Sequence, residues 1–95
     1  MAAYIVFMRD KMKDPAAFET YMAAVPPTFA GHVVKPLSVY GKLETLEGPP
    51  IEGAVIAEFE TYEAALAWYH SPAYQAAVQH RYKAGDYRVF ILQGM

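Results

Sequence analysis

The chain has 95 residues, of which 55% are hydrophobic and 15% aromatic, and its formal net charge is −2. That length fits a single domain over residues 1–95, and the apolar content excludes a disordered chain. The weak negative charge, without any basic run, excludes long-range attraction to nucleic acid or to an anionic membrane surface. The absence of cysteine excludes disulfides and thiolate metal sites, and it fits a reducing compartment.

No targeting or membrane segment is expected either. The first residues lack a basic segment followed by an apolar run, which is the pattern of a signal peptide. No apolar run approaches the ~20 residues that a membrane helix needs. We therefore expect a cytoplasmic protein that makes no contact with a membrane.

The chain is predicted to open with a strand and a helix. Residues 3–9 indicate the strand, since β-branched and aromatic residues fill both of its alternating faces. The helix is expected to begin at Asp14-Pro15, because aspartate caps free N–H groups and proline suits the first helical position. It ends or kinks at Pro26-Pro27, which supply no backbone N–H.

A long hairpin is predicted in the middle of the chain. Residues 33–46 indicate an irregular second strand, and Pro36 near its start favours an edge position or a bulge. A turn at residues 47–50 then makes residues 39–46 and 54–59 the two arms of the hairpin. The second arm is apolar on both faces except for one glutamate, so we expect it near the centre of the sheet.

Two helical segments and a last strand complete the chain. Thr61 is expected to cap the first segment, and Ser71-Pro72 to begin the second at a new angle. Gly85 ends it, and residues 86–93 form a strand that is apolar on both faces at its centre. The inner stripe of the first segment is expected to consist of Tyr62, Ala65, Leu66 and Tyr69, with Trp68 and His70 flanking it on opposite sides.

The element order is βαββαβ, which predicts an α+β protein of ferredoxin-like topology with a four-stranded antiparallel sheet in the order 4-1-3-2. Two helices then cover one face of the sheet. The other face carries half of the alternating side chains of strands 1, 3 and 4, and no element of the chain remains to cover it. We therefore expect a homodimer in which two copies pack sheet to sheet with two-fold symmetry. The alternative is a monomer whose open face is merely semi-polar.

Several short motifs of this chain occur together in a known family. They are Asp14-Pro15, Leu46-Glu47-Gly48, Glu58-Phe59, Ala67-Trp68-Tyr69, Ser71-Pro72-Ala73-Tyr74-Gln75 and Gly94. Over essentially the whole chain, the sequence resembles a small, mostly bacterial family of unknown function in the dimeric α/β-barrel superfamily. His70 and Glu60 stand where an acidic residue and a proline, respectively, are common. That superfamily includes cofactor-independent monooxygenases, isomerases, haem-handling proteins and plain structural dimers, so the resemblance implies a fold and a dimer but no particular activity.

The histidines number 3, enough for a metal site, but the predicted topology argues against one. His32 is expected at the start of the second strand, and His80 at the opposite end of the sheet, near the end of the second helical segment. We therefore expect no metal and no other cofactor within one chain; a metal that bridges two chains stays an alternative.

The central strand carries one charge, Glu58. It is either unpaired at the end of the sheet or paired with Arg9 or Arg88 across the sheet. A structural ion pair is expected there rather than a catalytic acid.

His80 and Arg81 are the weak candidates for catalysis. Near the close of a helix, such side chains compensate the C-terminal end of the helix dipole. In a functional interpretation they form an acid/base or anion-binding pair that faces a pocket between helix and sheet, with Arg81 holding a carboxylate. Arg81 shares a helix face with Tyr74 and Val78, which is unusual for a purely solvated side chain.

The 8 tyrosines and the single tryptophan provide candidates for a ligand site. Such rings could line a pocket for a flat molecule, with the hydroxyls fixing its orientation. The candidate ligand-binding residues are Tyr21, His32, Tyr40, Trp68, Tyr69 and Tyr74. The alternative is that the rings simply fill the core and the dimer interface, and that His32 is a surface loop residue.

Functions of different kinds fit these residues. The first is a non-catalytic dimer that binds a small molecule or serves as an assembly module. The second is a cofactor-independent monooxygenase or isomerase, with His80, Arg81 and the tyrosines polarising a small aromatic or enolisable substrate. A haem-handling protein would need His80 or His32 as an axial ligand in a large cavity.

Overall fold

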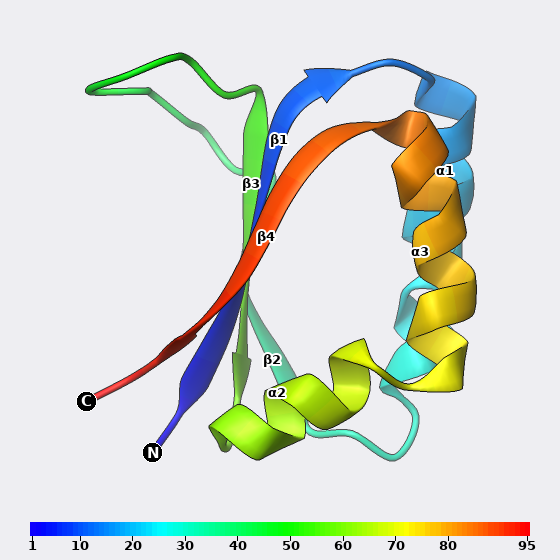
Figure 1. The fold of residues 1–95 in the computed structure, drawn as a ribbon, viewed down its shortest axis with the longest axis vertical. Helices are drawn as coiled ribbons and strands as arrows, with labels where there is room; N and C mark the ends of the chain where they lie inside the picture. The colour runs from blue at the N-terminus through cyan, green and yellow to red at the C-terminus, as the bar shows by residue number, and fades with distance from the viewer.

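The chain forms a four-stranded sheet with helices along one side, as seen in the computed structural model, which describes residues 1–95 (Figure 1). None of its helices is both long and apolar enough to cross a membrane. The elements, in chain order, are β1 (Ala3–Met12), α1 (Pro15–Ala24), the short 3₁₀ helix η1 (Pro26–Phe29), β2 (Val34–Val39), β3 (Gly53–Phe59), α2 (Tyr62–Tyr69), α3 (Pro72–Ala84) and β4 (Gly85–Gln93).

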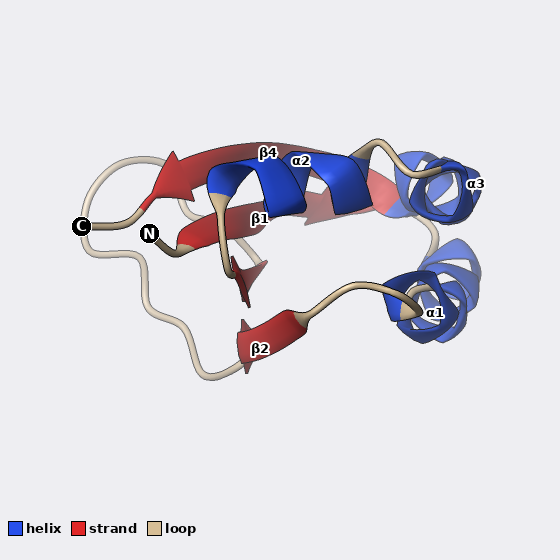
Figure 2. Cartoon of the chain, turned by 90° about the horizontal axis from the view of Figure 1, so that it is seen from below, coloured by secondary structure: helices blue, strands red, loops and turns tan.

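The sheet is antiparallel throughout and has the order β2-β3-β1-β4, which confirms the predicted topology. Ile5 of β1 stands opposite Ala57 of β3 and Ile91 of β4. Because side chains alternate along a strand, this row faces the helices and the next row faces away. Helices α1 and α3 lie side by side on the first face, and α2 crosses one end of it (Figures 1 and 2).

The helices begin where capping chemistry predicts. Asp14 Oδ1 accepts from the backbone N–H groups of Ala16 and Ala17, at 3.1 and 3.2 Å. Thr61 Oγ1 accepts from Ala64 N–H at 3.0 Å, and Ser71 Oγ accepts from Tyr74 N–H at 3.2 Å. Each cap satisfies N–H groups that have no partner within their own helix.

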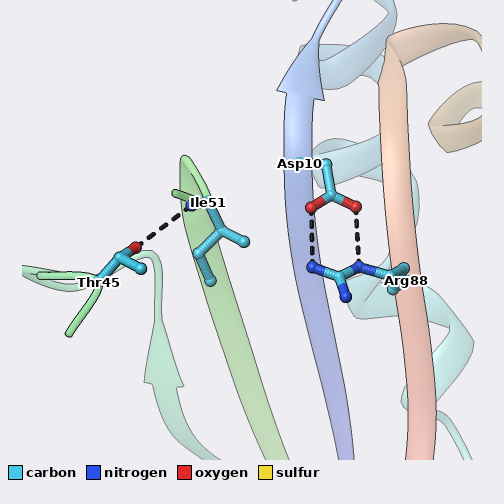
Figure 3. A network of polar contacts seen from close by, with 4 residues as sticks. All are labelled: Asp10, Thr45, Ile51 and Arg88. Atoms are coloured by element: carbon cyan, nitrogen blue, oxygen red, sulfur yellow. Dashed lines mark hydrogen bonds and ion pairs between the residues drawn. The ribbon is translucent and has the colours of Figure 1, made fainter. Parts of the chain in front are cut away.

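The expected hairpin arm over residues 39–46 is wrong. Strand β2 ends at Val39, because the next residue, Tyr40, has a backbone φ of 50° and turns the chain out of the sheet. Residues 41–52 form a loop without a strand, in which Ile51 N–H donates to Thr45 Oγ1 at 3.3 Å (Figure 3). The prediction drawn from Pro36 is confirmed, since β2 is an edge strand with a bulge just after Pro36.

The predicted inner stripe of α2 also needs correction. Trp68 is only 1% exposed and is the largest fully buried side chain, whereas Tyr62 lies at the surface. The indole packs against Phe59 of β3, Phe29 of η1 and Tyr74 of α3, with ring centroids 5.5, 5.4 and 4.1 Å apart. The buried face of α2 is therefore formed by Ala65 and Trp68, and the predicted stripe is rotated about the helix axis.

Gly85 joins α3 directly to β4 at a point of close backbone approach. Its φ of 173° is extended backbone, so the left-handed turn typical of a helix-ending glycine is not used here. A Cβ atom at this position would overlap the backbone oxygen of Lys11 in β1. The backbone N–H groups of Lys13 and Asp14 also donate to Ala84 O, at 2.7 and 2.9 Å. Glycine is therefore required at position 85, because a side chain there has no space beside the backbone of β1.

Candidate functional site

A cavity of about 230 Å³ lies between the helix-facing side of the sheet and the α1–η1 segment. Ten of its twelve lining residues are hydrophobic, and none is charged. The lining residues are Phe7, Pro36, Val39, Val55 and Ala57 of the sheet, Tyr21, Met22, Val25, Pro26 and Phe29 of the α1–η1 segment, Tyr40 after β2, and Trp68 of α2. Apolar walls with a few polar atoms are typical of small-molecule sites.

The indole of Trp68 is a fixed wall of this cavity. Its Nε1–H donates to Thr28 Oγ1 at 3.1 Å, and the Thr28 hydroxyl donates to Val25 O at 2.6 Å. Thr28 is itself buried, so both polar groups depend on this short chain for hydrogen bonds. The ring therefore has one position, in which it closes one side of the cavity.

Two tyrosine pairs supply the polar atoms near the cavity. The hydroxyls of Tyr21 and Tyr74 lie 2.8 Å apart, and those of Tyr40 and Tyr87 also 2.8 Å. Burial, reinforced by the Tyr74 hydroxyl, raises the pKa of Tyr21. Burial and the hydrogen bond to Tyr87 raise the pKa of Tyr40 in the same way. Both phenols that line the cavity are therefore neutral around pH 7 and act as hydrogen-bonding groups.

Arg81 lies beside these tyrosines and is only 4% exposed. Its guanidinium carbon stands 5.0 Å from the ring centroid of Tyr87 and 5.9 Å from those of Phe7 and Tyr21. Two of those rings line the cavity, although Arg81 itself does not. We call the set of residues Tyr21, Tyr40, Tyr69, Tyr74, Tyr87 and Arg81 the tyrosine–arginine cluster.

Arg9 was not predicted as a site residue, although it supports one cavity wall. Its guanidinium stacks over Tyr40 and Phe18, with centroid distances of 5.0 and 5.2 Å, and it lies 3.5 Å from the Glu52 carboxylate. Glu52 is the last residue of the loop after β2, so this pair depends on tertiary structure. The one sequence feature that could have indicated this role is the position of Arg9, a cation at the end of an otherwise apolar strand.

The proposed ion pairs of Glu58 are wrong. Arg9 pairs with Glu52 instead, and Arg88 forms a two-pronged pair with Asp10, at 3.0 and 2.9 Å (Figure 3). Glu58 has no ion pair, which was the other possibility considered from the sequence.

The remaining candidates lie outside the cavity wall. Tyr74 packs against Trp68 and Tyr69 against Tyr74, and Tyr69 lines a second, more open cavity of about 270 Å³ between α2 and β4. His32 follows η1, and His80 is half-buried on α3; neither lines either cavity. No three histidine, aspartate or glutamate side chains lie close enough together to hold a metal ion.

A four-stranded antiparallel sheet in this order, with its helices on one side, defines an α+β protein of the ferredoxin-like fold. The chain belongs to the family described as Domain of unknown function (DUF1330), whose model matches residues 2–95. This confirms the resemblance seen in the sequence motifs. No curated protein matches the chain in sequence.

Solved structures of similar fold cover nearly the whole chain. A protein of unknown function from Rhodopseudomonas palustris matches with a TM-score of 0.72 at 22% identity, over 99% of this chain and 82% of that chain. A dimeric ferredoxin-like protein of unknown function from Thermobifida fusca matches with a TM-score of 0.67 at 16% identity, over 99% and 92% of the two chains. The cofactor-independent oxygenase SnoaB from Streptomyces nogalater matches with a TM-score of 0.61 at 12% identity, also over 99% and 92%. At these identities the similarity establishes the fold.

Proposed function

We propose that this protein is a homodimer that binds a small, mostly apolar aromatic molecule in the cavity between the sheet and α1. The observation that carries the proposal is the cavity of about 230 Å³ with Trp68 as one wall and the hydroxyl-bearing rings of Tyr21 and Tyr40 as others. The cysteine-free composition supports a reducing compartment such as the cytoplasm.

The size and lining of the cavity select the class of ligand. A dry apolar cavity of about 150 Å³ accepts benzene. The 230 Å³ found here therefore suit one aromatic ring with a few substituents. The half-buried ring of Phe29 can pack against such a ring, and the phenol of Tyr21 can bond a polar substituent.

The lining favours binding over proton-transfer catalysis. No histidine, aspartate, glutamate or lysine lines the cavity, and His80 is not among its walls. A general base works best with a pKa near the working pH, whereas burial moves the pKa values of Tyr21 and Tyr40 upward, away from neutrality. A monooxygenase or isomerase activity is therefore the less supported alternative.

The dimer is supported by the sheet face that no helix covers. Phe90 and Leu92 of β4 are 45% and 57% exposed, and Val6 and Ile56 stand beside Phe90 in the same row. The chain exposes 5989 Å², roughly 500 Å² more than a monomer of 10.6 kDa usually does. Similar structures from Thermobifida fusca and Bacteroides fragilis are described as dimeric. A second copy, packed face to face, would cover this surface.

A titration monitored by Trp68 tests the cavity, because this tryptophan is the only one in the chain. We expect p-cresol, 4-methylbenzamide or 4-methylbenzoate to change its emission and to raise the melting temperature. Val39→Phe should fill the cavity mouth and abolish the change. Leu37→Phe is the matched control, since Leu37 is equally exposed on the same strand but does not line the cavity. If none of the three compounds binds at millimolar concentration, the proposal is wrong.

Sedimentation at micromolar concentration tests the dimer. We expect twice the chain mass of 10.6 kDa. Phe90→Lys should shift the protein to monomer, because two-fold symmetry brings like charges together in an apolar interface. Tyr82→Lys, an exposed position on α3, should leave the mass unchanged. A wild-type chain that sediments at its own mass contradicts the dimer.

A further inference from the structure

Arg81 is a buried cation without an acidic partner. It is 4% exposed, and its Nε–H group has no hydrogen-bond acceptor. The ion pairs of the chain are Arg9–Glu52, Lys13–Asp86 and Arg88–Asp10, so no carboxylate compensates Arg81. A guanidinium does not lose its proton in a protein, and a buried charge is costly unless an opposite charge faces it.

The surroundings of Arg81 reduce the free-energy cost of burying its charge without removing it. Aromatic faces attract the guanidinium, and the last turn of α3 contributes about half an elementary negative charge near its carbonyl groups. Burial by itself lowers the pKa of Arg81, but the neighbouring Tyr74 and Tyr21 raise it further, and a guanidinium keeps its proton in any case. The phenols are neutral near pH 7 and cannot serve as counter-ions.

The hydroxyl chain beside Arg81 leads to the cavity. The Arg81 guanidinium carbon stands 5.9 Å from the ring centroid of Tyr21, which lines the cavity, and the Tyr21 hydroxyl is 2.8 Å from that of Tyr74. Because either hydroxyl of this pair can be the donor, Tyr74 can donate to Tyr21. Tyr21 is then free to donate to an oxygen atom in the cavity. The side of the cavity formed by Tyr21 and Phe7 is thus also the side of positive charge.

We infer that the ligand of the cavity is an aromatic carboxylate, whose carboxylate oxygen accepts from Tyr21 and whose charge compensates the unpaired Arg81 guanidinium. This inference rests on the proposed binding function and adds the chemical class of the ligand. The ring occupies the apolar part of the cavity against Trp68, and the carboxylate lies at the end nearest Arg81.

The test compares 4-methylbenzoate with 4-methylbenzamide, which have nearly the same shape but differ in charge. Calorimetric titration of the wild-type protein should show tighter binding of the carboxylate by about tenfold or more, the effect of one charge-assisted hydrogen bond. Arg81→Met should remove this preference while leaving amide binding in place. Arg88→Met is the matched control, since Arg88 is exposed and paired with Asp10, and it should keep the preference.

Each outcome separates the two proposals. If both compounds bind equally to the wild type, or if Arg81→Met still prefers the carboxylate, the inference is overturned and the cavity function stands. If neither compound binds, the inference fails, and the cavity function fails with it when p-cresol does not bind either. We expect Arg81→Met to fold, with an unfolding midpoint equal to or above that of the wild type, since it removes an unpaired buried charge. Should it not fold, the wild-type comparison and Tyr21→Phe, which removes the donor at the cavity, still decide.

Discussion

Truncation of Trp68 to alanine measures how much of the core depends on one side chain. The indole is 1% exposed and contacts the rings of Phe7, Phe29, Phe59 and Tyr74. Replacing such a ring by a methyl group costs about 3–5 kcal/mol, from lost apolar burial and from the space left behind. The loss should not exceed this range, because the partner of the indole N–H, Thr28, keeps its own hydrogen bond to Val25 O.

The assay is urea unfolding at fixed protein concentration, followed by far-ultraviolet circular dichroism because the variant has no tryptophan. Since whole domains are stable by only about 5–15 kcal/mol, a loss of this size should move the midpoint substantially. Tyr62→Ala, at the surface of the same helix, is the control and should cost at most about 1 kcal/mol. A loss below about 1 kcal/mol for Trp68→Ala would show that the ring is not part of the core.

Three further outcomes are expected. Thr28→Val leaves the buried Trp68 N–H without an acceptor and should cost about 1–3 kcal/mol in urea unfolding; a change within about 0.5 kcal/mol would contradict the hydrogen bond. Gly85→Ala forces β1 and β4 apart and should lower the free energy of unfolding by at least about 2 kcal/mol. Gly31→Ala, where only the positive φ of 82° is strained, should cost less. The reverse order would contradict the close approach of the backbone at Gly85. Burial raises the pKa values of four tyrosines of the cluster above 10.0. Above that pH the unfolded chain loses protons that the folded chain keeps, so the free energy of unfolding should fall as pH rises. Absorbance titration should show these phenols ionising only with unfolding, and normal titration of all of them in the folded protein would refute the burial.

The parts of the fold that sequence reasoning predicts are those governed by local chemistry. Asp14, Thr61 and Ser71 begin helices because their side chains bond nearby N–H groups, and this depends on a few neighbouring residues only. The strand order follows from the element order and short connections, and it was also correct. The end of β2 depended instead on the left-handed backbone of Tyr40, a conformation that a tyrosine in an apolar run does not signal.

The candidate site was predicted only in part, because its contacts join distant parts of the chain. Tyr21 meets Tyr74, and Tyr40 meets Tyr87, across 53 and 47 residues. Helical spacing indicated that Arg81 shares a face with Tyr74, but no local pattern indicates that its Nε–H lacks an acceptor.

The shared use of one indole has a consequence for how relatives of this protein can diversify. Under the proposed binding function, any change at Trp68 alters ligand selectivity and fold stability together, since the ring is both a cavity wall and part of the core. A relative that accommodates a larger molecule has to gain room elsewhere. The side of the cavity formed by Met22, Val25 and Pro26 offers that freedom, because these residues are not fully buried in the core. We expect variation in ligand size among relatives to map to this segment.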